Sequence, residues 1–303
     1  MSAGGRIRIR VPGSTANLGS GFDVLGLALG LYNTIEMEEI ARGVELTVEG
    51  EGADRLQRDV ERSLVVRAAR AAFAHLGVTA PGLRIHLKNA IPLRRGLGSS
   101  GTACLGGVVG AAELVGRPLA VADVLKLALP FEGHPDNITP SLVGGLTATC
   151  VSEGAVRYVK IPVPETIRIV AVVPDRELST AEARRALPQQ VPLTDAVYNV
   201  GRAAMLVGAL VAGDLGLLDE ATRDRLHQPY RAKLLPGMEE VFEAGRRAGA
   251  LAVFLSGAGS TVVALVEREA ETVGREMVEA WTARGIRAQA KVLTIDLEGV
   301  RLS

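Results

Sequence analysis

The stretch PLRRGLGSSGTACLGG, residues 92–107, constrains this chain more than any other part of it. Gly96 to Gly101 satisfies the pattern G-x-G-x-x-G, which in dinucleotide-binding folds follows a strand directly and opens a helix. Those folds also place an acidic residue at the end of the next strand, roughly 20 residues further on. Here NAIPLRR separates the expected strand from the glycines, and Asp123 falls inside a helical pattern. The context therefore does not indicate a dinucleotide site.

The glycines do not form a P-loop either, because no lysine follows Gly101 as G-x-x-x-x-G-K-[ST] requires. Their physical character still favours phosphate. Gly96 and Gly98 permit close backbone approach, while Ser99 and Ser100 stand where a helix begins, with free N–H groups and the positive end of its dipole. We interpret the loop as a phosphate cradle, with a tightly packed, ligand-free helix start as the open alternative.

The composition is typical of a soluble globular enzyme: of 303 residues, 48% are hydrophobic and 22% charged. The formal net charge of zero argues against a nucleic-acid partner. Cys104 and Cys150 lie in apolar, glycine-rich surroundings and are expected to be reduced and buried, without a metal or a disulfide. The N-terminal MSAGGRIRIR has no apolar segment, and no uninterrupted apolar run is long enough to span a membrane. We expect a cytoplasmic protein with no membrane partner.

The order of expected elements predicts an α+β fold. Strands are expected at 6–11, 32–40, 44–50 and 82–88, and helices at 60–77, 99–115 and 119–129. A loop is expected at 132–140 and a hairpin at 144–161. A second pattern then gives a strand at 167–174, helices at 179–188, 193–212 and 236–248, a strand–turn–strand at 250–266, a helix at 269–285 and a last strand at 287–295. Two prolines in KIPVPET mark the expected boundary between an N-terminal domain, 1–160, and a C-terminal domain, 161–303.

Three ordered motifs resemble those of the GHMP kinases, small-molecule kinases named for galactose, homoserine, mevalonate and phosphomevalonate. PLRRGLGSSGTA is similar to their central motif, VPGSTANLGSGFDVLGLAL (11–29) to their N-terminal motif, and LSGAGSTVVAL (255–265) to their C-terminal glycine motif. The resemblance covers essentially the whole chain. It implies a two-domain α+β fold, in which an N-terminal ATP-binding domain resembles the second domain of ribosomal protein S5, with its left-handed βαβ crossover. The C-terminal domain would be ferredoxin-like, and the protein a homodimer.

Within the GHMP kinases, four stretches resemble the homoserine kinases: Ser14–Gly26, EGHPDN (132–137), STAEARRALP (179–188) and QPYRAKLLPG (228–237). The last two resemble segments that bind the amino-acid end of homoserine. The resemblance implies transfer of the ATP γ-phosphoryl group to the side-chain hydroxyl of L-homoserine, giving O-phospho-L-homoserine and ADP for threonine biosynthesis.

The residue types agree with a zwitterionic substrate, which needs an anion for its ammonium group and bidentate donors for its carboxylate. Asp23 suits the ammonium group, and Arg184 and Arg231 suit the carboxylate. Neutral hydrogen bonds are available from Asn17, His134, Asn137 and Thr180. Each also has a purely structural reading: a helix cap for Asp23 or Thr180, a solvated charge for Arg184, an ion pair for Arg231, and an ordinary loop residue for His134.

For the nucleotide, the resemblance implies that the ATP phosphates are bound by Pro92, Leu93, Arg94, Arg95, Gly96, Leu97, Gly98, Ser99, Ser100, Gly101 and Thr102. It assigns Mg²⁺ to Ser100 and Glu132, oxygen ligands of the kind the ion prefers. Arg94 and Arg95 depart from the small residues often found at those positions in the family. The family's adenine-side Asn near position 62 is also absent, so no adenine contact is assigned.

Other GHMP kinases place a catalytic Asp at the motif where this chain has Asp136 and Asn137. The resemblance to homoserine kinases puts Asn137 near the substrate hydroxyl, and an amide cannot accept its proton as a base. We therefore expect no strong side-chain base, with catalysis by positioning and charge neutralisation. The expected catalytic set is Asn137, Asp136, Ser100 and Glu132. Two alternatives stay open: a kinase for another small alcohol, such as mevalonate or shikimate, and a non-catalytic metabolite-binding paralogue.

Overall fold

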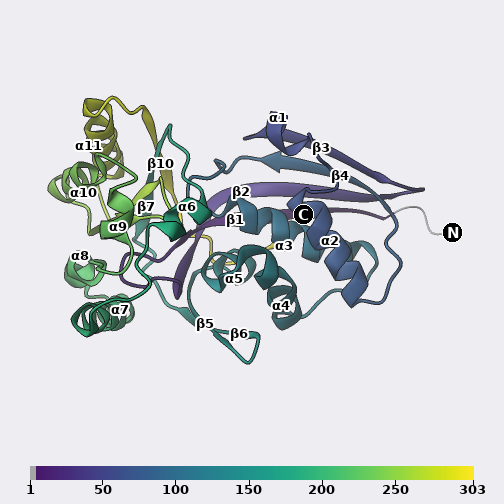
Figure 1. Cartoon of the computed structure of the whole chain (residues 1–303), viewed down its shortest axis with the longest axis horizontal. Helices are drawn as coiled ribbons and strands as arrows, with labels where there is room; N and C mark the ends of the chain where they lie inside the picture. The colour runs from purple at the N-terminus through teal and green to yellow at the C-terminus, as the bar shows by residue number, and fades with distance from the viewer. Residues whose placement is uncertain (1–4) are drawn as a thin grey trace.

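The computed structural model describes residues 5–303, so Met1–Gly4 of the N-terminal segment lie outside it. Its first sheet has seven strands and occupies the right of Figure 1. Its strands are β1 (Arg6–Ala16), β2 (Leu25–Ile40), β3 (Val44–Gly50), β4 (Gly82–Asn89), β5 (Leu146–Ser152), β6 (Ala155–Ile161) and β11 (Arg301–Leu302). The order β11-β1-β2-β4-β3 forms the main path, and β5 joins it through β2.

Helices cover one face of this sheet. They are α2 (Leu64–His75), α3 (Ser99–Leu114), α4 (Val121–Glu132) and α5 (Pro135–Val143), whereas the short α1 (Ala53–Leu56) lies beside β3 (Figure 1). Buried Phe73 of α2 and Leu105 of α3 belong to one core with Ile9, Ile35 and Ile85 of the strands. The strands β3 and β4 run parallel, with α1 and α2 between them in the chain, so this half contains a β-α-β unit.

The second sheet, at the left of Figure 1, has the order β10-β7-β9-β8, with every adjacent pair antiparallel. Its strands are β7 (Arg168–Pro174), β8 (Ala252–Leu255), β9 (Val262–Val266) and β10 (Ala288–Leu293). Helices α6 (Thr180–Arg185), α7 (Leu193–Ala212), η1 (Leu215–Leu217), α8 (Leu218–Ala221), α9 (Gln228–Ala232) and α10 (Met238–Arg247) precede β8, and α11 (Ala270–Ala283) precedes β10. This β-α-β-β-α-β order is the ferredoxin-like arrangement, as predicted.

Two local predictions were wrong. Residues 132–140 were expected to form a loop, but they contain the end of α4 and most of α5. Prolines misled the prediction, because Pro135 occupies the first turn of α5, where its missing N–H has no helical partner to lose. Cys150 is exposed near the end of β5, whereas Cys104 is buried as expected, and burial raises the pKa of its thiol to about 12.

The C-terminal segment returns to the first sheet. There β11 pairs antiparallel with β1, and the buried carboxylate of Asp296 accepts hydrogen bonds from the Tyr32 hydroxyl at 2.9 Å and the Gly299 N–H at 2.6 Å. The strands β1–β6 and β7–β10 separate between Ile161 and Arg168, but β11 crosses back. The division into 1–160 and 161–303 therefore stays a prediction, and the last residues pack with the N-terminal half.

Gly26 fixes the distance between β2 and the start of α5. A Cβ atom at this position would lie 1.7 Å from the Asp136 carbonyl oxygen. We expect Gly26→Ala to lower the free energy of unfolding by about 2–4 kcal/mol, because backbone must move to relieve the overlap. Chemical denaturation measures this change. Gly216→Ala is the matched control, since its Cβ would make only an ordinary 3.6 Å contact; equal effects of the two substitutions would contradict the prediction.

Candidate active site

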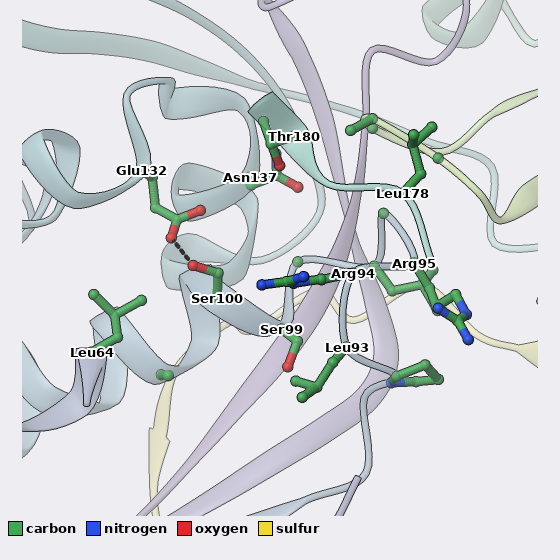
Figure 2. Close-up of a pocket in the computed structure, with 18 of the residues that line it drawn as sticks. Leu64, Leu93, Arg94, Arg95, Ser99, Ser100, Glu132, Asn137, Leu178 and Thr180 are labelled. Carbon is green, nitrogen blue, oxygen red and sulfur yellow. Dashed lines mark hydrogen bonds between the residues drawn. The ribbon is translucent and has the colours of Figure 1, made fainter. Parts of the chain in front are cut away.

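A cavity of about 540 Å³ lies between the two halves of the molecule, within the range of small-molecule sites. It is lined by most of the residues that the sequence predicts for the site: Asn17, Asp23, residues 92–100, Glu132, His134, Asp136, Asn137, Thr180, Arg184 and Arg231. Figure 2 shows several of these side chains around it. Gly101 and Thr102 are buried in the first turn of α3 and do not line the cavity. The Thr102 hydroxyl instead accepts from the Asn33 amide and donates to the Ser99 carbonyl.

The glycine loop leaves the backbone N–H groups at the start of α3 without a side-chain cap, beside the cavity. Gly96 and Gly98 have positive φ angles of 76° and 74°, and no side chain caps the helix, which begins at Ser99. A Cβ on Gly98 would lie 2.4 Å from the Ser14 hydroxyl, so glycine is required for this close approach. Uncapped N–H groups at the positive end of a 16-residue helix could hold an anion.

The C-terminal glycine motif supports this loop. The Ser256 hydroxyl donates to the Gly96 carbonyl at 2.6 Å, and the Thr261 N–H donates to the Arg95 carbonyl at 3.1 Å. These bonds join segments 160 residues apart in the chain. The third motif therefore supports the glycine loop, a role that its sequence does not reveal.

Ser100 and Glu132 meet at the cavity wall, where the serine hydroxyl donates to Glu132 Oε1 (Figure 2). Burial raises the pKa of the Glu132 carboxyl, and the hydrogen bond from Ser100 opposes that rise. The described residues contain no group of three or more His, Cys, Asp or Glu able to hold a metal alone. Adjacent hydroxyl and carboxylate oxygens beside an anion site nevertheless fit Mg²⁺, which takes few protein ligands and completes its shell with phosphate and water.

A second set of charges, from Asp23, His134 and Arg184, also lines the cavity. Asp23 Oδ1 is 2.5 Å from Arg184 Nη2, and Asp23 Oδ2 is 3.8 Å from His134 Nδ1. Asn17 accepts from the Asp23 backbone N–H at 3.0 Å, and both residues have positive φ angles. Asp23 and Arg184 remain about 30% exposed, so a polar ligand can reach both groups.

Arg231 is almost fully buried, with 2% of its surface exposed. Its Nη1 donates to the Gly257 carbonyl at 2.8 Å and lies 3.2 Å from His227 Nδ1. Burial lowers the pKa of Arg231 to about 10, so the guanidinium stays charged at neutral pH. The Phe22 ring faces the guanidinium groups of both Arg231 and Arg184, at 5.4 and 5.1 Å from its centroid. Such contacts favour a cation against an aromatic face.

The sequence predictions missed three contributors to this set: Phe22, His227 and Gly257. Phe22 lies inside the N-terminal motif, and His227 directly precedes QPYRAKLLPG, so a signal was present. His227 is buried, stacks on Phe22 with 5.0 Å between ring centroids, and lies 2.8 Å from the Gly19 carbonyl. Burial lowers the pKa of His227 to about 4, so the ring is neutral near pH 7.

Asp136 and Asn137 stand in the first turn of α5. Asn137 Oδ1 accepts from the Ser14 hydroxyl at 3.0 Å, which fixes its amide. Asp136 is buried, and its Oδ1 atom has no hydrogen-bond partner. Burial, with a smaller contribution from the nearby charge of Asp23, raises the pKa of Asp136 from 3.8 to about 7.

Comparison with known proteins matches residues 63–145 to the GHMP kinases N terminal domain and residues 206–283 to the GHMP kinases C terminal domain. The homoserine kinase of Caldanaerobacter subterraneus subsp. tengcongensis is 45% identical to this chain, over 99% of it and 96% of the relative. The chain belongs to the homoserine kinase family of the GHMP kinases. The homoserine kinase of Aquifex aeolicus is similar too, at 44% identity over 98% of this chain and 99% of its own.

Solved structures agree with this family assignment. A homoserine kinase from Cytophaga hutchinsonii superposes with a TM-score of 0.90 at 30% identity, covering 98% of this chain and 97% of its own. A mevalonate kinase from L. major, solved with R-mevalonate, has a TM-score of 0.73 at 19% identity, covering 96% of both chains, and shares the fold. The predicted two-domain GHMP kinase fold is confirmed.

The raised pKa of Asp136 predicts a pH-dependent stability. The native carboxyl keeps its proton up to about pH 7, whereas the unfolded chain releases it near its ordinary pKa of 3.8. Wild-type stability from this group therefore falls as pH rises between those values. We expect the free energy of unfolding of Asp136→Asn, relative to wild type, to increase by about 2–3 kcal/mol between pH 5 and pH 8.

Urea denaturation at the two pH values measures this difference. Asp54→Asn, which alters an exposed carboxylate in α1, is the control and should change the difference by less than about 0.5 kcal/mol. A stability difference for Asp136→Asn that does not depend on pH would contradict the assignment.

Proposed function

We propose that this protein transfers the γ-phosphoryl group of ATP to the side-chain hydroxyl of L-homoserine. The hydroxyl oxygen forms the new bond to the γ-phosphorus, the bond from the γ-phosphorus to the β,γ-bridging oxygen breaks, and the products are O-phospho-L-homoserine and ADP. One observation carries the proposal: Asp23, Arg184 and Arg231, the charges that suit an amino acid, line one cavity with the glycine loop, which suits phosphate. In the cell, this reaction would serve threonine biosynthesis.

The nucleotide would lie along the glycine loop. Its phosphates fit the backbone of residues 92–100 and the first turn of α3. Leu56, Leu64, Leu87 and Leu93 also line the cavity and offer apolar surface that suits the base. Ser100 and Glu132 would hold Mg²⁺, which when bound neutralises phosphate charge.

The bound amino acid would replace the ion pair between Asp23 and Arg184. Asp23 and Arg184 pair at 2.5 Å, and a zwitterion supplies a better-matched partner to each, its ammonium group to Asp23 and its carboxylate to Arg184. The buried guanidinium of Arg231 would bind the same carboxylate. Asn17, His134 and Thr180 line the cavity and would supply the neutral hydrogen bonds.

No side-chain base is required in this scheme. Asn137, held by Ser14, would orient the hydroxyl, and the proton would pass to phosphate or solvent. Asp136 is the alternative candidate for a general base. It lines the same cavity as Asp23, Arg184 and Arg231, which supports grouping it with the proposed amino-acid clamp. Positioning by the two sets of groups is then the main source of rate.

Substrate specificity tests the clamp. In a coupled ADP-release assay with Mg-ATP, we expect turnover of L-homoserine but not of D-homoserine, L-serine, mevalonate or shikimate. Asp23→Asn should lower kcat/KM for L-homoserine by about 10- to 100-fold, because it removes a charge-assisted bond. Asp54→Asn should leave it unchanged. Turnover of an amine-free alcohol would contradict the clamp, and ATP binding without turnover of any alcohol would favour a metabolite-binding protein.

The absence of a base has its own test. We expect Asn137→Ala to reduce kcat by at least about 1,000-fold, because the hydroxyl loses its orientation. Asp136→Asn should reduce kcat by less than about tenfold, below the usual effect of losing a general base. Both values come from steady-state kinetics, with circular dichroism to verify folding. Complete loss of activity in a folded Asp136→Asn variant would show that Asp136 is the base.

A further inference from the structure

The buried guanidinium of Arg231 is held in place by neutral groups. Within the part of the chain that the structure describes, no carboxylate forms an ion pair with it, and its Nε atom has no hydrogen-bond partner. Its Nη1 atom is held by the Gly257 carbonyl and by His227 Nδ1. A buried charge is costly unless partners surround it, so the direction in which this cation points depends on these two contacts.

The contact with Arg231 assigns the tautomer of His227. A guanidinium has N–H donors and no acceptor, so His227 Nδ1, at 3.2 Å from Nη1, must accept. The proton of the neutral ring is then on Nε2, which donates to the Gly19 carbonyl at 2.8 Å. Each edge of the imidazole therefore has its own partner, and the ring connects the backbone of Gly19 to the guanidinium.

Gly19 belongs to the turn between β1 and β2 that also carries Asp23. This turn packs tightly against the segment that precedes His227, because a Cβ on Gly19 would lie 1.8 Å from the Thr222 carbonyl oxygen. The φ angle of Gly19 is 71°, a conformation that glycine adopts without strain. His227 therefore lies between the backbone that positions Asp23 and the side chain of Arg231.

The His227 ring is also fixed across its face and along its backbone. Phe22 stacks on it, with 5.0 Å between ring centroids and 23° between the ring planes. The buried Asp224 carboxylate accepts from the backbone N–H of His227 at 3.0 Å. The same carboxylate accepts from the N–H groups of Leu226 and Gln228, at 2.8 and 2.6 Å. The ring is thus oriented by several contacts that do not involve the cavity.

Asn199 extends this support to α7. Its amide donates to Asp224 Oδ1 at 2.8 Å and to the Ser20 carbonyl at 3.2 Å, so it joins the loop before α9 to the turn that carries Asp23. By length and composition alone, α7 is also the one helix among residues 5–303 that could cross a membrane. Its buried Asn199 instead anchors the inner side of the helix to this network.

The two ends of the connection match the two charges of an α-amino acid. In the proposed function, Asp23 binds the ammonium group and Arg231 the carboxylate. These substrate groups are attached to one carbon atom, so their separation is fixed, and the protein groups must keep a matching separation. A rigid ring bonded at both edges keeps that separation better than the flexible arginine chain does alone.

We propose that His227 is a positioning residue that holds the Arg231 guanidinium at the distance from Asp23 that a zwitterion requires. The proposal rests on the proposed function for the identity of the ligand. His227 does not line the cavity, so it would act through Arg231 and not by touching the substrate.

Two amide substitutions separate this role from ordinary packing. In His227→Asn the amide oxygen can take the place of Nδ1 and accept from Arg231, whereas in His227→Gln the longer amide reaches the place of Nε2. We expect His227→Gln to raise KM for L-homoserine at least about tenfold and His227→Asn to raise it less than about threefold. KM for ATP should not change in either variant.

Urea denaturation of the same variants should give the opposite order. Asn removes more of the buried side chain than Gln does, so we expect His227→Asn to be the less stable protein. Trp281→Phe, which shortens a buried ring outside the cavity, is the control and should lower stability without changing either KM. An unchanged KM in both His227 variants, or a KM that rises in the order of lost stability, would overturn the proposal.

A double substitution tests whether His227 acts through Arg231. In an Arg231→Met background, His227→Gln should change kcat/KM for L-homoserine by less than about threefold, because the guanidinium that His227 holds is gone. The same loss in both backgrounds would contradict a positioning role.

Calorimetric titration with L-homoserine repeats the comparison without turnover. We expect the Kd of the His227 variants to follow the same order as KM. A wild type that binds L-homoserine but does not phosphorylate it would refute the proposed kinase activity and leave the positioning test decidable. Equal binding by wild type and both variants would refute the positioning role alone.

Discussion

The backbone of Gly257 joins the parts of the site. Its carbonyl accepts from both the Asn17 amide and the Arg231 guanidinium, and its N–H donates to the Ala16 carbonyl. The preceding residue, Ser256, holds the glycine loop through Gly96. A single turn between β8 and β9 therefore connects the end of β1, the phosphate loop and a buried arginine. The cavity exists because these contacts hold the two sheets together at this point.

Burial and local polar partners set the protonation states of Arg231 and Asp136 in the cavity. Arg231 keeps its charge although little water reaches it, because the Gly257 carbonyl accepts from it, His227 Nδ1 lies 3.2 Å from its Nη1 and the Phe22 ring faces it. Asp136 lies close by but has no such partner for Oδ1, so its charged form is disfavoured. The same low-dielectric surroundings thus hold one group charged and keep another protonated near neutrality, depending on the polar partners that each finds.

The sequence was sufficient for the fold class and for the residues that gather at the cavity, because motifs with glycines at fixed spacings depend on local backbone geometry. It was insufficient where long-range contacts decide. Proline at 135 and 140 looked like punctuation, yet α5 tolerates both. The exposure of Cys150 could not be judged from its apolar neighbours in the chain, because it depends on what packs against β5. The supporting role of Ser256 depends on a partner 160 residues away, which no local pattern encodes.

The return of the chain to its first sheet has a practical consequence. The strand β11 ends one residue before the C-terminus, and the Ser303 N–H donates to the Arg8 carbonyl. A tag fused at this end would extend an edge strand beside β1, so it needs a flexible spacer. Removal of the last eight residues would expose Tyr32 and leave the phenol without the carboxylate that it now contacts. Residues 296–303 thus hold part of the N-terminal half in place, and their removal would destabilise it.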